Sequence, residues 1–348
     1  MNEPGRQLII TNGDSAAVTM TAAGLGEVVS SGQPIPDECA NVILPWRDVL
    51  HEGPVPFVSG LSELAEHRIA FLESKGMGAD GTTRSDFERR NTIVEDNGSF
   101  DRVVLWFEHD LYDQLQLIEV LSWFAEHPRV DQTLWLVQCD GYLGEFSPEQ
   151  IGQWQTLAKP VNASQLAIAR EAWQAVRQPT PEAWAALVGQ DLSPLPFLAG
   201  AIVRMLEELP DTRSGLRRTE RHIVTLIRSG IQRPAHLFRD YQVLEEARFL
   251  GDWWFFDRIA QMAWCSSPLL DGLEAARSEQ IWRDGEDHNR FLNSTLRLTV
   301  IGNEVLAGRE DYFSHDTIDR WWGGTHLSND NDWRWDAKNA RLIPPQRT

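Results

Sequence analysis

Three residues that could carry chemistry stand together in one short stretch: Glu108, His109 and Asp110. They come directly after the apolar run of residues 103–107, which predicts a fully buried strand, and before a helical pattern with leucine and isoleucine on one face. An imidazole between two carboxylates is suited to general acid–base catalysis, because the carboxylates favour the protonated ring. The same residues are also typical of a buried polar network that only stabilises a fold, and both interpretations stay open.

A second candidate site lies near the amino terminus, where a predicted strand is followed by Asn12-Gly13-Asp14-Ser15 and a helix of small residues. A turn between a strand and a helix is typical of phosphate binding, since glycine permits close approach and the helix N-terminus attracts anions. Asn12, Gly13 and Ser15 are therefore candidate ligand-binding residues. Asp14 would orient a substrate or hold a divalent metal with Asp110. The simpler alternative is that Asp14 only caps the helix and Asn12-Gly13 only forms a turn.

Polar residues follow the other predicted strands as well. Arg47 and Asp48 come after the second strand, and Asp140 comes after the fourth. Arg47 could bind a phosphate through its forked guanidinium, or form only a weak surface pair with Asp48. Gln114, one turn into the helix that follows the third strand, could reach the same place. We include Arg47, Asp48, Gln114 and Asp140 among the candidate ligand-binding residues.

The first half of the chain alternates apolar strands with helices, the strands lying at residues 7–11, 41–46, 103–107 and 132–139. This alternation predicts an α/β fold with a mostly parallel, Rossmann-like sheet and right-handed crossovers. All the strand ends then share one edge of the sheet, which is where open α/β sheets bind ligands. The polar residues named above are therefore predicted to meet at the carboxyl edge of the sheet.

The composition bounds the class of protein. The chain of 348 residues is 42% hydrophobic and 24% charged, which is typical of soluble globular proteins. It contains no apolar run of about 18 residues and no recognisable signal peptide, so we expect no membrane partner. Its three widely spaced cysteines, Cys39, Cys139 and Cys265, favour a cytoplasmic location.

The net charge of −19 is unevenly divided along the chain. Residues 1–210 carry 13 Lys and Arg against 30 Asp and Glu, whereas residues 211–348 carry 19 against 21. The acidic part should repel nucleic acid, while the nearly neutral part could carry a local basic face. This asymmetry supports at least two domains with different roles.

The patterns predict an α/β domain at residues 1–158, a helical connector at 159–210 and, beyond the polar segment that follows Pro210, a winged-helix-like domain at 211–310. That domain would contain three helices and a strand–turn–strand wing in the segment LRLTVIGNEVLAG. Five arginines are its candidate phosphate contacts: Arg213, Arg217, Arg218, Arg221 and Arg228. The alternative is that this domain binds no DNA. Residues 311–348 form an aromatic C-terminal extension whose tryptophans should pack on a core.

Several segments together resemble the bacterial domain-of-unknown-function 1835 family, in the expected order along nearly the whole chain. They are NGDS at 12–15, WRDVLHEGP at 46–54 and LWFEHDLYDQLQL at 105–117, followed by GLRRTE, RFLGD and RWWGG. The three N-terminal motifs show no departure from the family's pattern. The resemblance implies no particular reaction.

Two functions from different classes follow from these observations. In the first, the N-terminal domain binds or processes a phosphorylated small molecule or nucleotide at the sheet edge, as a hydrolase or phosphotransfer enzyme would, with a divalent metal as a candidate cofactor. In the second, it senses a ligand while residues 211–310 bind DNA. An interaction scaffold is favoured only if side chains plug the sheet edge.

Overall fold

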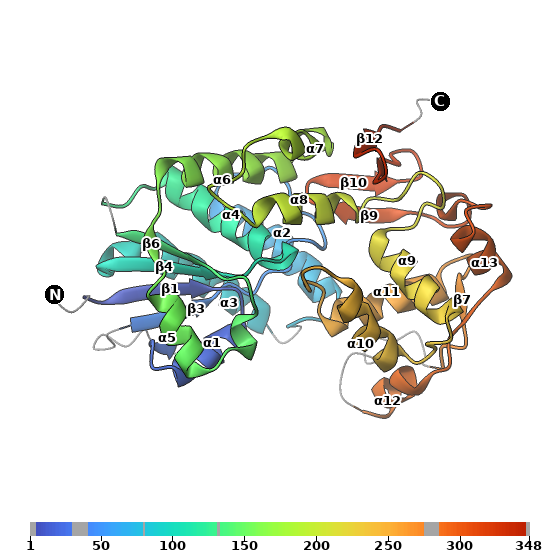
Figure 1. Cartoon of the computed structure of the whole chain (residues 1–348), viewed down its shortest axis with the longest axis horizontal. Helices are drawn as coiled ribbons and strands as arrows, with labels where there is room; N and C mark the ends of the chain where they lie inside the picture. The colour runs from blue at the N-terminus through green and yellow to red at the C-terminus, as the bar shows by residue number, and fades with distance from the viewer. Residues whose placement is uncertain (1–4, 30–40, 79–80, 131–132, 275–284, 346–348) are drawn as a thin grey trace. The chain divides into compact units, whose positions relative to one another are not determined.

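A six-stranded sheet forms the centre of residues 1–201, the first of the two units into which the chain divides (Figure 1). The computed structural model describes residues 5–29, 41–78, 81–130, 133–274 and 285–345. The strand order is β2-β3-β1-β4-β5-β6. The pairs β2–β3, β3–β1, β1–β4 and β4–β5 are parallel, and only the edge pair β5–β6 is antiparallel. The predicted α/β fold with a mostly parallel sheet is confirmed.

The strands and helices of the first unit alternate as expected, with two short edge strands that the sequence did not reveal, β2 and β6. In chain order the elements are β1 (Gln7–Thr11), α1 (Asp14–Ala22), β2 (Glu27–Val28), β3 (Asn41–Pro45), α2 (Gly60–Ser74), α3 (Thr82–Glu95), η1 (Asn97–Ser99), β4 (Arg102–Phe107), α4 (Leu111–Glu126), β5 (Leu134–Gln138), η2 (Leu143–Glu145), α5 (Pro148–Gln155), β6 (Lys159–Pro160), α6 (Ala163–Val176), α7 (Glu182–Ala186) and η3 (Leu187–Gly189).

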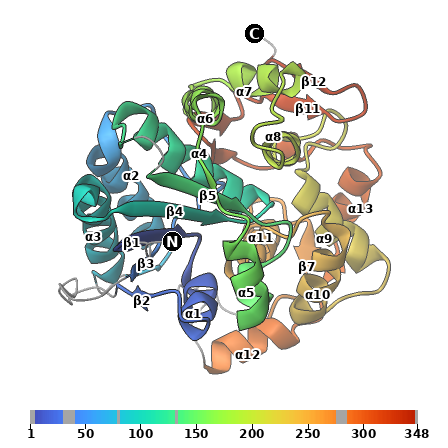
Figure 2. The same cartoon turned by 60° about the vertical axis from the view of Figure 1, so that its left-hand side comes forward.

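Both faces of the sheet are covered by helices. Figure 2 shows α1 and α5 on one face and α4 with α6 on the other. Alternate residues of β4 account for this: Val104 and Trp106 belong to the core under α1 and α5, while Val103, Leu105 and Phe107 are fully buried on the opposite side. A strand buried on both faces needs a continuous apolar run, which is the pattern that marked this strand in the sequence.

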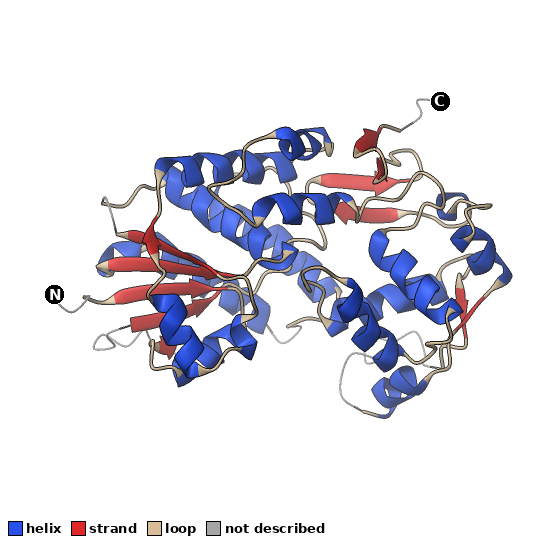
Figure 3. Cartoon of the chain, in the orientation of Figure 1, coloured by secondary structure: helices blue, strands red, loops and turns tan. Residues whose placement is uncertain are grey.

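The second unit, residues 202–348, is mainly helical with short antiparallel strand pairs (Figure 3). Helix α8 (Leu198–Leu206) crosses the division between the units. The remaining elements are α9 (Arg218–Arg228), α10 (Pro234–Leu244), α11 (Asp252–Trp264), β7 (Leu270–Asp271), α12 (Glu286–Asn293), β8 (Arg297–Leu298), α13 (Val300–Leu306), η5 (Tyr312–Ser314), β9 (Asp319–Trp322), β10 (Thr325–Ser328), β11 (Arg334–Asp336) and β12 (Arg341–Ile343). The finer boundaries predicted at residues 158, 210 and 310 stay predictions.

The three helices predicted at residues 219–264 are present, but the predicted wing is wrong. Only Arg297–Leu298 form a strand, and Val300–Leu306 form helix α13. The Thr299 side chain caps this helix by accepting a hydrogen bond of 2.9 Å from the Gly302 amide. Gly302, which in the sequence resembles a turn residue, lies inside the helix, at a position where the Leu269 carbonyl leaves no room for a side chain.

The C-terminal extension packs its tryptophans largely as expected. Trp322, Trp333 and Trp335 are buried, whereas Trp321 is 39% exposed. The Trp322 indole donates a hydrogen bond of 2.7 Å to the Met205 carbonyl. Packing on a core is therefore confirmed for three of these four rings. Among the described residues, no helix combines the length and apolar character needed to cross a bilayer.

Candidate functional site at the carboxyl edge of the sheet

The predicted site residues follow strands that lie side by side in the sheet, at the point where the chain changes the direction in which it adds strands. From β1 the chain moves to β2 and β3 on one side, then crosses to β4 on the other side of β1. Ligands of open α/β sheets bind at such a reversal, beyond the carboxyl ends of the strands. Residues 12–15 follow β1 and residues 108–113 follow β4, so parallel pairing brings both segments to this point.

A cluster of three buried carboxylates, Glu108, Asp110 and Asp113, lies where β4 passes into α4. One oxygen from each lies within 4.8 Å of the others, and the residues are 5%, 3% and 0% exposed. Asp110 is the N-cap of α4, with its side chain accepting a hydrogen bond of 3.2 Å from the Asp113 amide. This carboxylate cluster therefore stands at a helix N-terminus, which favours negative charge.

Hydrogen bonds from three separate segments hold the carboxylate cluster. The Asp113 carboxylate accepts from the Glu108 amide at 2.6 Å and from the Asn12 side-chain amide at 2.8 Å. The Glu108 carboxylate accepts from the Leu143 amide at 2.7 Å. The ends of β1, β4 and β5 are thus joined through these acids, which fixes their positions without supplying a positive charge.

Burial and mutual repulsion oppose ionisation of the carboxylate cluster. The pKa of Asp110 is raised to about 8, first by burial and then by the charge of Glu108. The pKa of Asp113 is also raised, by burial and then by Asp110 and Glu108. Such a group of acids either keeps protons at neutral pH or binds a cation, and carboxylate oxygens are the ligands that Mg²⁺ and Ca²⁺ prefer.

The turn after β1 packs directly against the carboxylate cluster. In addition to the bond from Asn12 to Asp113, the Tyr112 hydroxyl donates to the Asn12 carbonyl at 3.1 Å. Gly13 is the N-cap of α1 and provides no side-chain cap, while Asp14 belongs to the first helical turn. The alternative in which Asp14 serves only as a cap is therefore wrong.

Arg47 reaches the same turn from the end of β3. Its guanidinium contacts one oxygen of Asp14 at 2.7 and 2.9 Å, and its amide donates to the Asn12 carbonyl at 3.3 Å. Its φ of +48° is a left-handed conformation that non-glycine residues rarely adopt, and such strain is concentrated at functional sites. Asp86 lies 3.5 Å from the guanidinium on another side. The alternative of an Arg47–Asp48 surface pair is wrong.

Asp48 lies in the interior and belongs to a separate ionic network. It is fully buried, contacts Arg68 at 2.9 Å and lies 4.0 Å from Arg90. Its carbonyl accepts a hydrogen bond of 2.7 Å from the Gln116 side chain. The two arginines match its charge, so this candidate ligand-binding residue has the surroundings of a structural one.

The three remaining candidate residues, His109, Gln114 and Asp140, lie in different environments at the carboxyl edge of the sheet. The His109 ring lies 5.1 Å from the Tyr142 ring and 5.9 Å from the Phe197 ring, between centroids. Gln114 is fully buried and donates to the Glu108 carbonyl at 2.6 Å, so it supports the carboxylate cluster. Asp140 is exposed just beyond β5.

Sequence reasoning overlooked Asp113 and Tyr112. The signal for Asp113 was its spacing, because a residue three positions after a helix N-cap lies in the first turn beside it. Tyr112 offered no comparable signal, since its hydroxyl bonds to the Asn12 carbonyl, 100 residues away in sequence.

A cleft of about 800 Å³ lies at the opposite, amino edge of the sheet. Its walls include Phe100 and Asp101 before β4, Thr133 before β5, and Trp123 and His127 at the end of α4. None of the predicted site residues lines it. The chemistry-bearing residues and this cleft therefore occupy different ends of the sheet.

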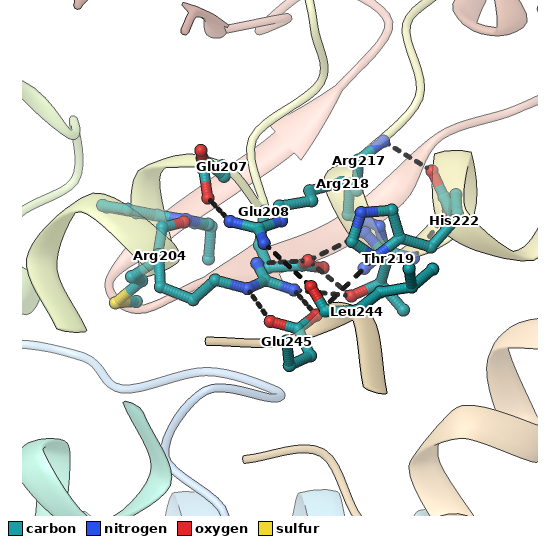
Figure 4. A network of polar contacts seen from close by, with 12 residues as sticks. Arg204, Glu207, Glu208, Arg217, Arg218, Thr219, His222, Leu244 and Glu245 are labelled. Atoms are coloured by element: carbon teal, nitrogen blue, oxygen red, sulfur yellow. Dashed lines mark hydrogen bonds and ion pairs between the residues drawn. The ribbon is translucent and has the colours of Figure 1, made fainter. Parts of the chain in front are cut away.

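The second unit contains a buried arginine network (Figure 4), formed by Arg204, Glu208, Thr219 and Glu245. The Arg204 guanidinium binds both oxygens of Glu245 at 2.8 Å and one oxygen of Glu208 at 2.8 Å. The Thr219 hydroxyl bridges Arg204 and Glu208. Burial alone would raise the pKa of Glu208. The charge of Arg204 opposes this effect and is the main cause that lowers the pKa to about 2.

Most of the arginines predicted to contact DNA phosphates have partners inside the second unit. Arg217 pairs with Glu220, Arg218 with Glu207 and Glu246, and Arg221 with Asp211. Arg213 donates to the Ala307 carbonyl, and Arg228 is exposed. These contacts neutralise much of the basic character that the sequence showed in this region.

Comparison with protein-family models gives no match, and a search of the curated proteins finds no relative of this chain. The resemblance to the domain-of-unknown-function 1835 family therefore stays a prediction.

Proposed function

We propose that the first unit binds a phosphate-bearing small molecule together with a divalent cation at the carboxyl edge of its sheet. The observation that carries this proposal is the bond between Asn12 and Asp113, which joins an anion-attracting turn to a cluster of buried acids. A phosphate–metal complex needs both kinds of group within a few ångströms of each other.

The cation would bind to the carboxylate cluster. Three carboxylates offer the hard oxygen ligands that Mg²⁺ or Mn²⁺ takes, and a cation would offset the burial and the repulsion that raise the pKa values of Asp110 and Asp113. Hydrogen bonds to Glu108 and Asp113 position these acids before a metal arrives. Asp14 does not belong to this group of acids and contacts Arg47 instead.

The phosphate would bind to Arg47 and to the first amides of α1. The Arg47–Asp14 pair is partly exposed, at 28% and 68% of the two side chains, so it is worth only about 0–1 kcal/mol and can open. A doubly charged phosphate is a stronger partner for the guanidinium and would also accept from the amides at the α1 N-terminus. Phosphoryl transfer and phosphate-ester hydrolysis are the reactions that such an arrangement serves, with His109 as the candidate acid–base group.

Thermal-shift measurements on the full chain test this proposal, with Mg²⁺, pyrophosphate and the two together. We expect the melting temperature to rise most when both are present. Arg47→Gln should weaken pyrophosphate binding by roughly 10-fold or more, since it removes charge-assisted hydrogen bonds. Arg84→Gln is the matched control, because Arg84 forms an exposed pair with Glu66 elsewhere in the unit. No shift with Mg²⁺ and pyrophosphate, or equal loss in both variants, would contradict the proposal.

DNA binding by the second unit is not part of this proposal, because Arg217, Arg218 and Arg221 are matched by carboxylates of the same unit.

A further inference from the structure

Three aromatic side chains gather beside the carboxylate cluster: His109, Tyr142 and Phe197. The His109 ring is tilted by 55° to the Tyr142 ring and by 67° to the Phe197 ring. All three residues are partly exposed. Trp106 and Phe107, a few residues back along β4, are by contrast at most 1% exposed. Unlike those core rings, this aromatic cluster keeps apolar surface at a polar edge of the sheet.

The aromatic cluster is tied to the turn proposed to bind phosphate. Tyr142 directly precedes Leu143, whose amide donates to Glu108. The next residue, Gly144, packs closely on Ser15, so that a side chain added at this position would meet the Ser15 side chain. Its carbonyl also accepts a hydrogen bond of 3.5 Å from Thr19 in α1. Residues 142–144 therefore connect the rings both to the carboxylate cluster and to the first turns of α1.

We propose that the phosphate-bearing ligand is a nucleotide whose base stacks on the aromatic cluster. This inference rests on the function proposed above and adds the class of substrate to it. Tyrosine and histidine rings can stack on a base, and stacking of this kind is tolerant of base identity because every base has a π-face. A sugar phosphate or pyrophosphate would use Arg47 and the carboxylate cluster but would leave the rings uncovered.

Two ligands that differ only by the base test this inference: adenosine 5′-monophosphate and ribose 5-phosphate. Calorimetric titrations of the full chain with each, in the presence of Mg²⁺, should show at least fivefold tighter binding of the nucleotide, which corresponds to the lower end of about 1–3 kcal/mol for one stacked base. Tyr142→Leu should remove most of this preference and leave ribose 5-phosphate binding unchanged, while Tyr142→Phe should keep it.

The outcomes separate the two proposals. Equal affinity for both ligands would overturn the nucleotide inference while leaving phosphate binding intact. A preference for the nucleotide that survives Tyr142→Leu would also overturn it, because the base would then bind elsewhere. Failure of both ligands and of pyrophosphate to bind would overturn the proposed function itself. Trp321→Leu, which removes an exposed ring of the second unit, is the matched control and should change neither affinity.

Discussion

The two units bury acidic residues in opposite ways. In the carboxylate cluster of the first unit, Glu108, Asp110 and Asp113 lie close together, and burial with mutual repulsion raises the pKa values of both aspartates. In the arginine network of the second unit, Glu208 and Glu245 surround Arg204, and the pKa of Glu208 falls to about 2. Arg204, which binds both glutamates, lowers the pKa of Glu208 against the effect of burial.

This contrast separates acids that are matched by a cation from acids that are grouped with one another. A buried pair with good hydrogen bonds is complete without any further partner, even where its net contribution to stability is small. In a buried group of like charges, the acids cannot all ionise unless they bind a cation, and otherwise some of them keep their protons. The first unit contains both kinds, since Asp48, which follows β3, is matched by Arg68 and Arg90.

Removal of Arg204 should produce the largest effect. Arg204→Met removes the guanidinium that binds Glu208 and the buried Glu245, and we expect a loss of about 3–5 kcal/mol in the unfolding free energy of the second unit. Chemical denaturation followed by tryptophan fluorescence measures it. Arg84→Met, at an exposed pair in the first unit, should cause no measurable change. Equal stability of Arg204→Met and wild type at neutral pH would show that the arginine network is not a structural pair.

Acid should weaken the second unit through Glu208 and Glu220. The pKa of each is lowered to about 2, against an ordinary value of 4.5, by Arg204 for the former and by Arg217 and Arg320 for the latter. A lowered carboxyl pKa stabilises the folded state above about pH 4.5, and this stabilisation is lost as the pH falls towards 2, at about 1.4 kcal/mol for each pH unit. Denaturation midpoints measured between pH 6 and pH 2.5 should therefore fall steeply, and a flat profile would contradict the assignment.

The carboxylate cluster should show the opposite dependence on pH, with a smaller effect. The pKa of Asp110 is raised from 3.8 to about 8, so the folded state binds more protons than the unfolded state between these values and loses stability as the pH rises. Asp110→Asn keeps an N-cap and removes the charge. When a metal chelator is present, the Asp110→Asn variant should be more stable than the wild type at pH 8 and equally stable near pH 4. The difference should grow as the pH rises between these limits.

A destabilised Asp110→Asn variant at pH 8 would mean that the ionised carboxylate already has a positive partner. In that case the carboxylate cluster and the arginine network would be the same kind of structure, and the comparison between the two units would fail.

The fold of the first unit was readable from the sequence because each central strand is buried on both faces and is followed by polar residues. The apolar run before Glu108 and the turn Asn12-Gly13 correctly marked the ends of β4 and β1. Parallel pairing of these two strands places both ends at the same edge of the sheet. The short edge strands β2 and β6 were not readable, since two residues carry no periodicity. The predicted wing was wrong because the segment LRLTVIGNEVLAG was interpreted as strand–turn–strand, although Val300–Leu306 form α13 and the packing of Leu269 requires a glycine at position 302.

The position of the candidate site residues at the edge of the sheet was predictable from the sequence, but the pairing of their side chains was not. Strand ends indicated where Asp14, Arg47 and Glu108 would lie, while the division between acids paired with arginine and acids grouped with one another depended on distant contacts. Asp48 and Asp110 are both acids beyond strand ends, yet Arg68, in helix α2, pairs with Asp48. Local sequence does not encode which arginine will fold against which carboxylate.

Binding of Mn²⁺ to the carboxylate cluster can be measured by electron paramagnetic resonance on the full chain. We expect one Mn²⁺ site at neutral pH that is lost in Glu108→Gln and Asp110→Asn and kept in Glu66→Gln, a control at an exposed acid of the same unit. No bound Mn²⁺ at millimolar concentration, or binding that survives Asp110→Asn, would contradict the claim that these buried acids form a cation site.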